Sequence, residues 1–314
     1  MVFTRDNEQS AKVSPLDKLI QRLPPTFVIW AIVIVLALTW GSSFLLLKYS
    51  LEVLEPAQVF AGRMFFAAIV LIPFVFRYLR KVTIKQWGLL FLFSFFTNFC
   101  TTYLNALAQS GITSSLNGVL SSLTPLMTLI VGFLLYKASL KRSQLLALLL
   151  GLLGVIALIL FERGTDVGRF NMYAFYAVVA ALCVGISTNM IRYHFSDFTS
   201  LQLASLSFFI IFPFATAYAI SSNFFEIAFA NQVGMVALEE IIFLGVISNA
   251  AAILLSAKLV EISSPIFASM VTYLMPIVAV GWGIWDGEVV SIKEIAAMAI
   301  IIVSIWLVNR FSKS

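Results

Sequence analysis

Charged residues are scarce in this chain. Only 11% of its 314 residues are Asp, Glu, Lys or Arg, whereas 61% are hydrophobic and the mean hydropathy is +1.00. A soluble globular domain contains about 25% charged and about 45–50% apolar residues. So few charges could not cover this much apolar surface in water, which excludes an ordinary soluble domain. We therefore expect a lipid bilayer to surround most of the chain.

Residues for metal, redox and hydrolytic chemistry are also few. The chain has one histidine, His194, and two cysteines, Cys100 and Cys183, which fall in apolar runs without CxxC spacing. We interpret both cysteines as small apolar packing residues. No Walker-type glycine loop, HExxH or GxSxG motif occurs in the sequence. The sequence therefore predicts no metal site, no cofactor and no enzymatic activity.

The apolar residues group into about ten windows long enough to cross a bilayer. A spanning helix needs about 20 mostly apolar residues, and lipid cannot satisfy the free backbone groups of other structures. We predict an all-α integral membrane protein with spans at Thr26–Leu47, Ala57–Phe76, Gln86–Leu107, Ser114–Leu135, Leu145–Phe161, Asn171–Ile191, Thr199–Ile220, Leu238–Leu259, Pro265–Trp285 and Lys293–Val308. The connections are expected to be short, apart from Ser221–Val236.

The basic residues predict the orientation of the chain. The formal net charge is +5, but the lysines and arginines lie in short connections between apolar windows, which argues against nucleic acid as a partner. Most of them fall in the N-terminal tail, residues 1–25, and in the connections on its side of the membrane. Because cytoplasmic loops carry the excess of Lys and Arg, we expect both termini in the cytoplasm. The cell inner (plasma) membrane is the default location.

The two halves of the chain resemble each other weakly. Leu123–Leu126 aligns with Leu274–Ile277, and both stretches contain a proline. Repeats over residues 26–161 and 171–310 would each hold five spans, and an odd number turns the second half upside down in the membrane. Inverted repeats are a common construction of secondary transporters, which place the solute site near the midplane. Chance similarity between leucine-rich helices is the alternative.

Polar residues line one face of the third and fourth predicted spans. They fall at helical spacing, so each set shares a face: Asn98, Thr101, Thr102 and Asn105 in the third span, and Asn117, Ser121, Thr124 and Thr128 in the fourth. At membrane depth such groups need partners, whether a wet cavity with a solute or hydrogen bonds to other helices. Pro125 and its repeat partner Pro276 are predicted to kink their helices.

Ionisable residues inside the spans are few. Arg63 lies in the second span, where it could bind an anionic solute group or anchor a neighbouring helix. Glu239 and Glu240 fall at the predicted start of the eighth span, where acids complement the helix dipole; coupling to protons is the alternative. Lys48 lies near a span end, where snorkelling to the headgroups explains it.

Several short motifs together point to a known family. Trp40-Gly41-Ser42-Ser43-Phe44 with Lys48, Arg63, Thr113-Ser114 before Pro125, and Gly287-Glu288 resemble the EamA family of the drug/metabolite transporter superfamily. The resemblance implies a ten-helix carrier whose central cavity is lined mainly by the first, third, fourth, sixth, eighth and ninth helices. Two positions depart from the family pattern, Lys137 where a glutamate is expected and Val184 as the repeat counterpart of Trp40.

We therefore expect a secondary active transporter that moves a small metabolite, amino-acid-like or drug-like, by alternating access, with export favoured. The solute would contact Asn98, Thr101, Thr102, Asn105, Asn117 and Ser121 in the first half, Asn249 and Tyr273 in the second, and the aromatic surfaces of Trp40 and Phe99. Protons are a candidate coupling ion, and the chain would act as a monomer or homodimer. A carrier of sugars, nucleotide sugars or lipid-linked substrates, or a non-transporting scaffold, is the alternative.

Overall fold

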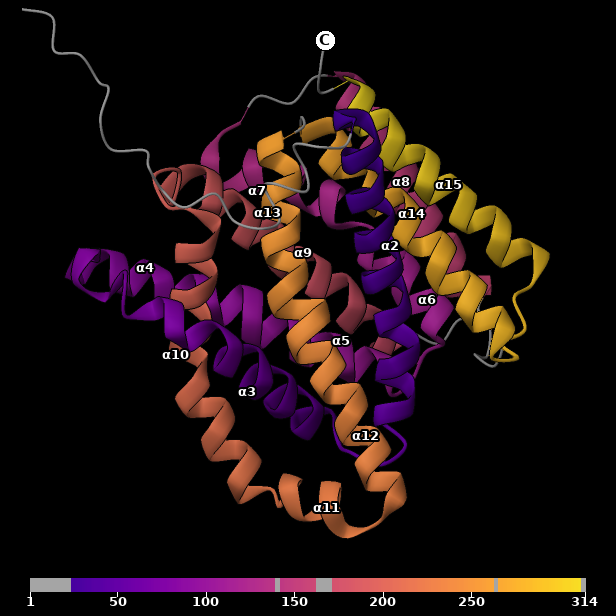
Figure 1. Cartoon of the computed structure of the whole chain (residues 1–314). Coiled ribbons are helices and arrows are strands. Elements are labelled where there is room, and N and C mark those ends of the chain that lie inside the picture. The colour runs from indigo at the N-terminus through magenta and orange to yellow at the C-terminus, as the bar shows by residue number, and fades with distance from the viewer. Residues whose placement is uncertain (1–23, 139–141, 162–170, 263–264, 312–314) are drawn as a thin grey trace, which may run out of the picture.

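The structure, a computed structural model, describes residues 24–138, 142–161, 171–262 and 265–311, and its regular elements in these ranges are all helices (Figure 1). The predicted tail, residues 1–25, lies almost entirely outside them. The first half comprises α2 (Pro25–Ser50), α3 (Pro56–Val75), η1 (Leu79–Lys81), α4 (Ile84–Ser94), η2 (Phe95–Cys100), α5 (Thr101–Gln109), α6 (Ser114–Ser121), α7 (Thr124–Tyr136) and α8 (Arg142–Phe161).

The second half repeats this order, with α11 in the place of η1 and one unbroken helix, α14, in the place of α6 and α7. It comprises α9 (Met172–His194), α10 (Ser200–Ser221), α11 (Phe224–Ala230), α12 (Gln232–Ile242), η3 (Phe243–Ala251), α13 (Ala252–Ile262), α14 (Pro265–Trp285) and α15 (Ile292–Phe311). Within the described ranges, seven helical stretches are long and apolar enough to cross a membrane by length and composition alone. With α8, α14 and α15, of 20, 21 and 20 residues, they give the ten expected spans.

The even number of spans brings both ends of the helical body to one face. The start of α2 and the end of α15 lie together at the top of Figure 1, which we call the upper face. The turn helix α11 lies at the opposite end, the lower face. Because successive spans reverse direction, the connection between α9 and α10 belongs to the upper face, and those before α6 and after α14 belong to the lower face.

Helices of each half pack directly against helices of the other half. The second helix of the first half, α3, packs against α10 and against η3 in the second half, and α10 packs in turn against α4 in the first half. Ala67, Ala68 and Phe208 are among the fully buried residues of this shared core. Large apolar side chains such as Leu146 and Trp285 point outward, as expected where lipid takes the place of water.

Both third helices of the halves contain a π-helical segment. Residues Phe95–Cys100 form η2 inside the third span, and residues Phe243–Ala251 form η3 inside the eighth. A π-helix pairs residues five apart instead of four and is frequent at functional sites. Its occurrence in equivalent helices supports the duplicated construction.

Three predicted boundaries are corrected by the structure. The stretch Ser221–Val236, expected as a connection, contains α11 and the first turn of α12. Because α12 begins at Gln232, Glu239 and Glu240 lie about two turns inside the eighth span rather than at its N-terminus. The fourth span is broken at Ser122–Leu123, just before Pro125 in the first turn of α7, whereas α14 continues through Pro276.

Candidate functional site

A central cavity of about 460 Å³ lies between the two halves. Its walls come from α2 and the third span in the first half, and from α9, α10 and α13 in the second. Phe198, in the connection between α9 and α10, and Ser200, at the first residue of α10, belong to its lining, so the cavity extends to the upper face. The described residues that line it are Trp40, Phe93, Thr97, Asn98, Val184, Ile191, Phe198, Ser200, Leu203, Ala204, Ser207, Ile253 and Ser256.

The cavity wall is apolar with a few hydrogen-bonding groups. The described lining includes no ionisable side chain; its polar groups are the hydroxyls of Thr97, Ser200, Ser207 and Ser256, the amide of Asn98 and the indole of Trp40. Apolar walls with a small number of placed polar groups are typical of small-molecule sites. This wall is suited to a solute without net charge.

Trp40 is held in place by the π-helical segment of the opposite half. Its Nε1 donates a hydrogen bond to the backbone oxygen of Ser248 at 2.9 Å. Ser248 belongs to η3, where the i→i+5 pairing changes which carbonyls are free to accept. This bond fixes the plane of the indole ring at the wall of the cavity, so the ring is available for stacking against a solute.

Asn98 occupies the equivalent segment of the first half, η2, and is 3% exposed. Its Nδ2 donates to Ser94 Oγ at 3.3 Å, and Ser94 Oγ donates to the backbone oxygen of Ser207 at 2.7 Å. The amide of Asn98 thus belongs to a chain of hydrogen bonds that crosses from the third span to α10. No hydrogen bond to Asn98 Oδ1 is seen among the described residues, and Asn98 lines the cavity.

Two other members of the polar stripes, Asn105 and Asn117, join the third span to the fourth. Asn105 Oδ1 accepts from Ser121 Oγ at 3.2 Å, and Asn117 Nδ2 donates to Gln109 Oε1 at 3.0 Å. Thr101 Oγ1 bonds the backbone oxygen of Phe96 at 2.9 Å. These side chains and the buried Thr102 are not part of the described cavity lining. The bonds of Asn105 and Asn117 correspond to the interhelical alternative, whereas the Thr101 bond stays within its own span.

The remaining predicted contacts lie around the cavity. Phe99 packs edge-on against Phe60, with ring centroids 5.1 Å apart, and lines a separate apolar hollow of about 220 Å³. Asn249 accepts from Arg63 instead of facing the described lining. Tyr273 belongs to α14, but its side chain lies outside the described residues.

Arg63 is buried between the halves, at 8% exposure. Its Nη2 donates to Asn249 Oδ1 at 2.8 Å, while its Nε is buried without a hydrogen-bond partner. This bond ties α3 to η3 one residue beyond the carbonyl that holds Trp40, a contact of the kind that the helix-anchoring alternative expects. Glu240 accepts from Ser50 Oγ at 3.0 Å, which ties α12 to α2, and Glu239 is exposed.

A polar network at the lower face joins α2 to the connection that follows α14. Lys48 Nζ forms ion pairs with Asp286 Oδ2 at 2.5 Å and Glu288 Oε1 at 3.5 Å, and the Tyr49 hydroxyl donates to Asp286. Lys48 therefore has specific partners within the protein, which the headgroup explanation expected for it did not include. Its partners lie more than two hundred positions away in the sequence, so reading the first span alone could not reveal them.

Glu288 extends this network to the N-terminus of α6. Its Oε1 accepts from Ser114 N and Oγ at 2.8 and 2.7 Å, and its Oε2 accepts from Ser115 N and Oγ at 3.1 and 2.6 Å. A carboxylate here satisfies first-turn N–H groups and complements the helix dipole. We call Lys48, Tyr49, Ser114, Ser115, Asp286 and Glu288 the lower latch, since their bonds join α2, α6 and the segment after α14 at the face opposite the cavity opening.

Acidification should leave the lower latch intact down to about pH 4. Hydrogen bonds from Lys48 and Tyr49 lower the pKa of Asp286. Burial works to raise the pKa of Glu288, but the hydrogen bonds from Ser115 and Ser114 outweigh it and lower that pKa too. A depressed pKa stabilises closure above the ordinary values of about 3.9 and 4.3, and this stabilisation is lost as the pH falls through the lowered values.

Hydrogen exchange at the Ser114 and Ser115 amides, corrected for the intrinsic pH dependence of exchange, measures this stability. We expect the same protection at about pH 7 and about pH 5. A marked loss of protection within that interval would contradict the assignment of both carboxylates as ionised partners.

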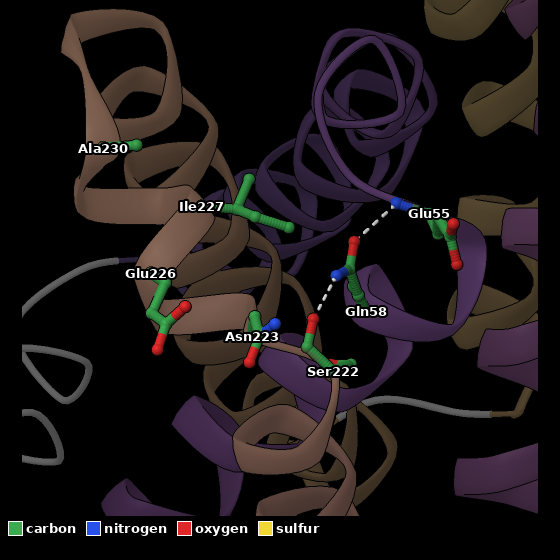
Figure 2. Close-up of a pocket in the computed structure, with 7 residues that line it drawn as sticks. All are labelled: Glu55, Gln58, Ser222, Asn223, Glu226, Ile227 and Ala230. Atoms are coloured by element: carbon green, nitrogen blue, oxygen red, sulfur yellow. Dashed lines mark hydrogen bonds between the residues drawn. The ribbon is translucent and has the colours of Figure 1, made fainter.

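A second hollow, of about 560 Å³, lies at the lower face between the start of α3 and the turn into α11. Figure 2 shows Gln58 bridging it: Gln58 Oε1 accepts from the Glu55 N–H at 2.9 Å, and Gln58 Nε2 donates to the Ser222 oxygen at 2.7 Å. The side chains of Glu55 and Glu226 stand on opposite sides of this hollow (Figure 2). These bonds fix the α10–α11 turn against α3.

Some residues of the cavity wall were not predicted. Ser200, Leu203, Ala204 and Ser207 follow one another at helical spacing on one face of α10, and all four line the cavity. Ser200, Ala204 and Ser207 lie at i, i+4 and i+7, and this spacing predicts a shared helical face as clearly as the polar stripes of the third and fourth spans do. Thr97 directly precedes Asn98 and lies four residues before Thr101, so it stood at the edge of the predicted stripe, whereas Ser256 is flanked by apolar residues and gave no such pattern.

The duplicated helical body, the π-helical segments and the cavity between the halves define a multi-pass membrane transporter. The chain belongs to the EamA-like transporter family, whose model matches residues 27–160 and 171–310. Members of this family are transporters and not enzymes, so the expectations of membrane transport and of no enzymatic activity are confirmed.

The other comparisons bear on the fold of the chain and not on its function. No curated protein matches the sequence at a significant level. One similar solved structure is described only as a crystal structure of a protein. The alignment covers 90% of this chain and 98% of the other chain, with 15% sequence identity and a TM-score of 0.55. A likeness at this identity supports the fold alone.

Proposed function

We propose that this transporter is a secondary carrier of a small organic solute without net charge, neutral or zwitterionic, with an amino-acid-like or drug-like body. The observation that carries the proposal is the lining of the central cavity, where Trp40 and Asn98 meet the hydroxyl-bearing face of α10 and the described wall has no charge. The indole would stack on the solute, and the amide and hydroxyls would hydrogen-bond its polar edge.

Alternating access follows from the contrast between the two faces. The cavity extends to the upper face, while the lower latch joins α2, α6 and the end of α14 on the opposite side. Transport would require release of the latch and closure of the upper face around the loaded site. With the termini in the cytoplasm, as the charge distribution predicts, loading at the upper face corresponds to export.

The alternative substrates fit this wall less well. A nucleotide sugar carries phosphate charges, which proteins bind through Arg, Lys or helix N-termini. The described cavity lining has no Lys or Arg; the N-terminus of α10 lies at its upper end without a basic side chain beside it in the lining, and the buried Arg63 faces Asn249. A non-transporting scaffold would have no use for a cavity whose polar groups converge from both halves.

Counterflow into proteoliposomes tests the proposal. Vesicles preloaded with pools of neutral and zwitterionic amino acids, sugars, or nucleotide sugars would be offered one labelled member at a time, with and without a pH gradient. We expect uptake of a net-neutral solute, reduced about tenfold or more by Asn98→Leu, because one lost hydrogen bond of about 1.4 kcal/mol has that effect. Trp40→Leu should reduce uptake similarly.

The matched control is Ser221→Ala. Ser221 is an exposed residue at the lower end of α10 whose hydroxyl bonds the Tyr218 oxygen of its own helix, so its loss should leave uptake unchanged. Preferred uptake of nucleotide sugars, or neutral-solute uptake insensitive to both Asn98→Leu and Trp40→Leu, would refute the proposal.

A further inference from the structure

The fold brings the two cysteines of the chain together from opposite halves. Cys100 is the last residue of η2, and Cys183 lies in the middle of α9. The two helices pack against each other, and the two thiols lie close enough to interact with each other. Reading them as separate packing residues therefore misses their most specific property, since they form a pair that crosses the interface between the halves.

This pair stands beside the central cavity. Thr97 and Asn98, three and two residues before Cys100, line the cavity, as does Val184, the neighbour of Cys183. Cys183 is 5% exposed, whereas Cys100 is only half-buried. A small reagent therefore meets Cys100 as the more accessible thiol, with Cys183 positioned behind it as the resolving thiol.

We propose that Cys100 and Cys183 form a dithiol site, and that a small-molecule disulfide oxidises it to a cross-link that arrests the carrier. The reaction is thiol–disulfide exchange in two steps. The Cys100 sulfur attacks the reagent disulfide, which forms a mixed disulfide and releases one reagent thiol that takes up the proton. The Cys183 sulfur then attacks the Cys100 sulfur, which releases the second reagent thiol; the two cysteines are oxidised and the reagent is reduced.

Arrest follows from where the bond forms. A disulfide holds its sulfur atoms at about 2.05 Å and its Cβ atoms at about 3.8 Å, so it fixes the third span to the sixth beside the solute site. Alternating access requires the two halves to move relative to each other, and a covalent tie between them opposes that motion. This second part of the inference rests on the proposed function, whereas formation of the disulfide does not.

The test treats the purified, reconstituted full-length protein with bis(2-hydroxyethyl) disulfide, a small uncharged oxidant. Intact mass and alkylation after denaturation report the disulfide independently of transport. We expect the wild type to lose two hydrogens and both alkylatable thiols, and Cys183→Ser to stop at a mixed disulfide on Cys100. Cys100→Ser should keep Cys183 in its free form, because the exposed member of the pair is missing.

Transport is measured on the same samples by counterflow. We expect oxidation to reduce wild-type uptake about tenfold or more, recovery on reduction, and no response in Cys100→Ser. Two free thiols or intermolecular cross-links after oxidation would overturn the dithiol site. An intramolecular disulfide with undiminished uptake would overturn the arrest. Absence of uptake in all reduced forms would instead refute the proposed function, while the mass measurement would still decide on the dithiol.

Discussion

Replacing Glu288 with alanine should release the N-terminus of α6 and loosen the lower face. The change removes a carboxylate that accepts four hydrogen bonds from Ser114 and Ser115 and contributes one of the two ion pairs of Lys48. Ser114 and Ser115 are buried, so water would not immediately replace the hydrogen bonds that their N–H and O–H groups lose. Hydrogen bonds to a charged group contribute about 1.5–3 kcal/mol each.

Losing about 3 kcal/mol of this stabilisation changes the ratio of latched to released forms about 100-fold. Hydrogen exchange at the amides of Ser114 and Ser115 measures that ratio directly, and we expect it to accelerate by about this factor in Glu288→Ala. Glu288→Gln keeps the size and one acceptor oxygen, so it should be intermediate. The control Glu239→Ala changes an exposed acid and should have no effect. Unchanged exchange in Glu288→Ala would show that the latch does not hold α6.

The ion pair between Lys48 and Asp286 stabilises the lower latch less than its short distance suggests. The Lys48 side chain is 34% exposed, and exposed ion pairs contribute about 0–1 kcal/mol because water and salt screen them. Glu288, at 5% exposure, is the buried member of the network. The stability of the lower latch therefore depends on Glu288 and its serines more than on the lysine.

The ten-helix fold could be predicted from the sequence because its signal is local. Each span is an apolar window, and lipid requires that window to be helical whatever it packs against. The boundaries near α11 were missed for the same reason: Phe224–Ala230 is short and lies in a stretch whose apolar residues form no complete window. Its place is fixed by packing against α12 and by the Gln58 bond to Ser222.

The polar stripe of the third span shows why the site was predicted only in part. Asn98, Thr101 and Asn105 share one face of a regular helix of 3.6 residues per turn. The π-helical pairing of η2 adds a residue to the turn that ends at Cys100, so the face changes at this point. Asn98 consequently lines the cavity while Asn105 contacts Ser121 of the fourth span. No residue in Phe95–Cys100 predicts a π-helix by its type.

Contacts between the halves could not be read from either half alone. Trp40 was predicted to face the solute, but its bond to the Ser248 oxygen depends on how η3 frees that carbonyl. The partner of Arg63 could not be predicted either, because Asn249 lies in the other half of the chain. The cysteines gave no motif at all, because their pairing depends on the way α9 crosses η2.

Adding a single methyl group at Gly185, in the variant Gly185→Ala, should destabilise the protein markedly. Gly185 is the point where α9 touches α7: a Cβ there would lie 2.8 Å from Met127 C and Thr128 N, and 3.0 Å from Met127 O. All three atoms are backbone, so no side chain can turn aside and the two helices must separate. Separation would also strain the bond from Asn189 Nδ2 to the Thr128 oxygen, 2.9 Å long.

Overpacking of a tight core costs about 1–3 kcal/mol, and a loss of this size lowers the unfolding midpoint by several degrees in a chain of this length. We expect that fall for Gly185→Ala in a thermal unfolding series on detergent-purified protein. The matched control is Gly281→Ala in α14, where a Cβ meets nothing within 4 Å. There, alanine should leave the midpoint unchanged or raise it, because Gly in a helix interior is less favourable than Ala by about 0.5–1 kcal/mol. The two glycines therefore predict effects of opposite sign for the same substitution, and equal midpoints would contradict the close approach of α9 and α7.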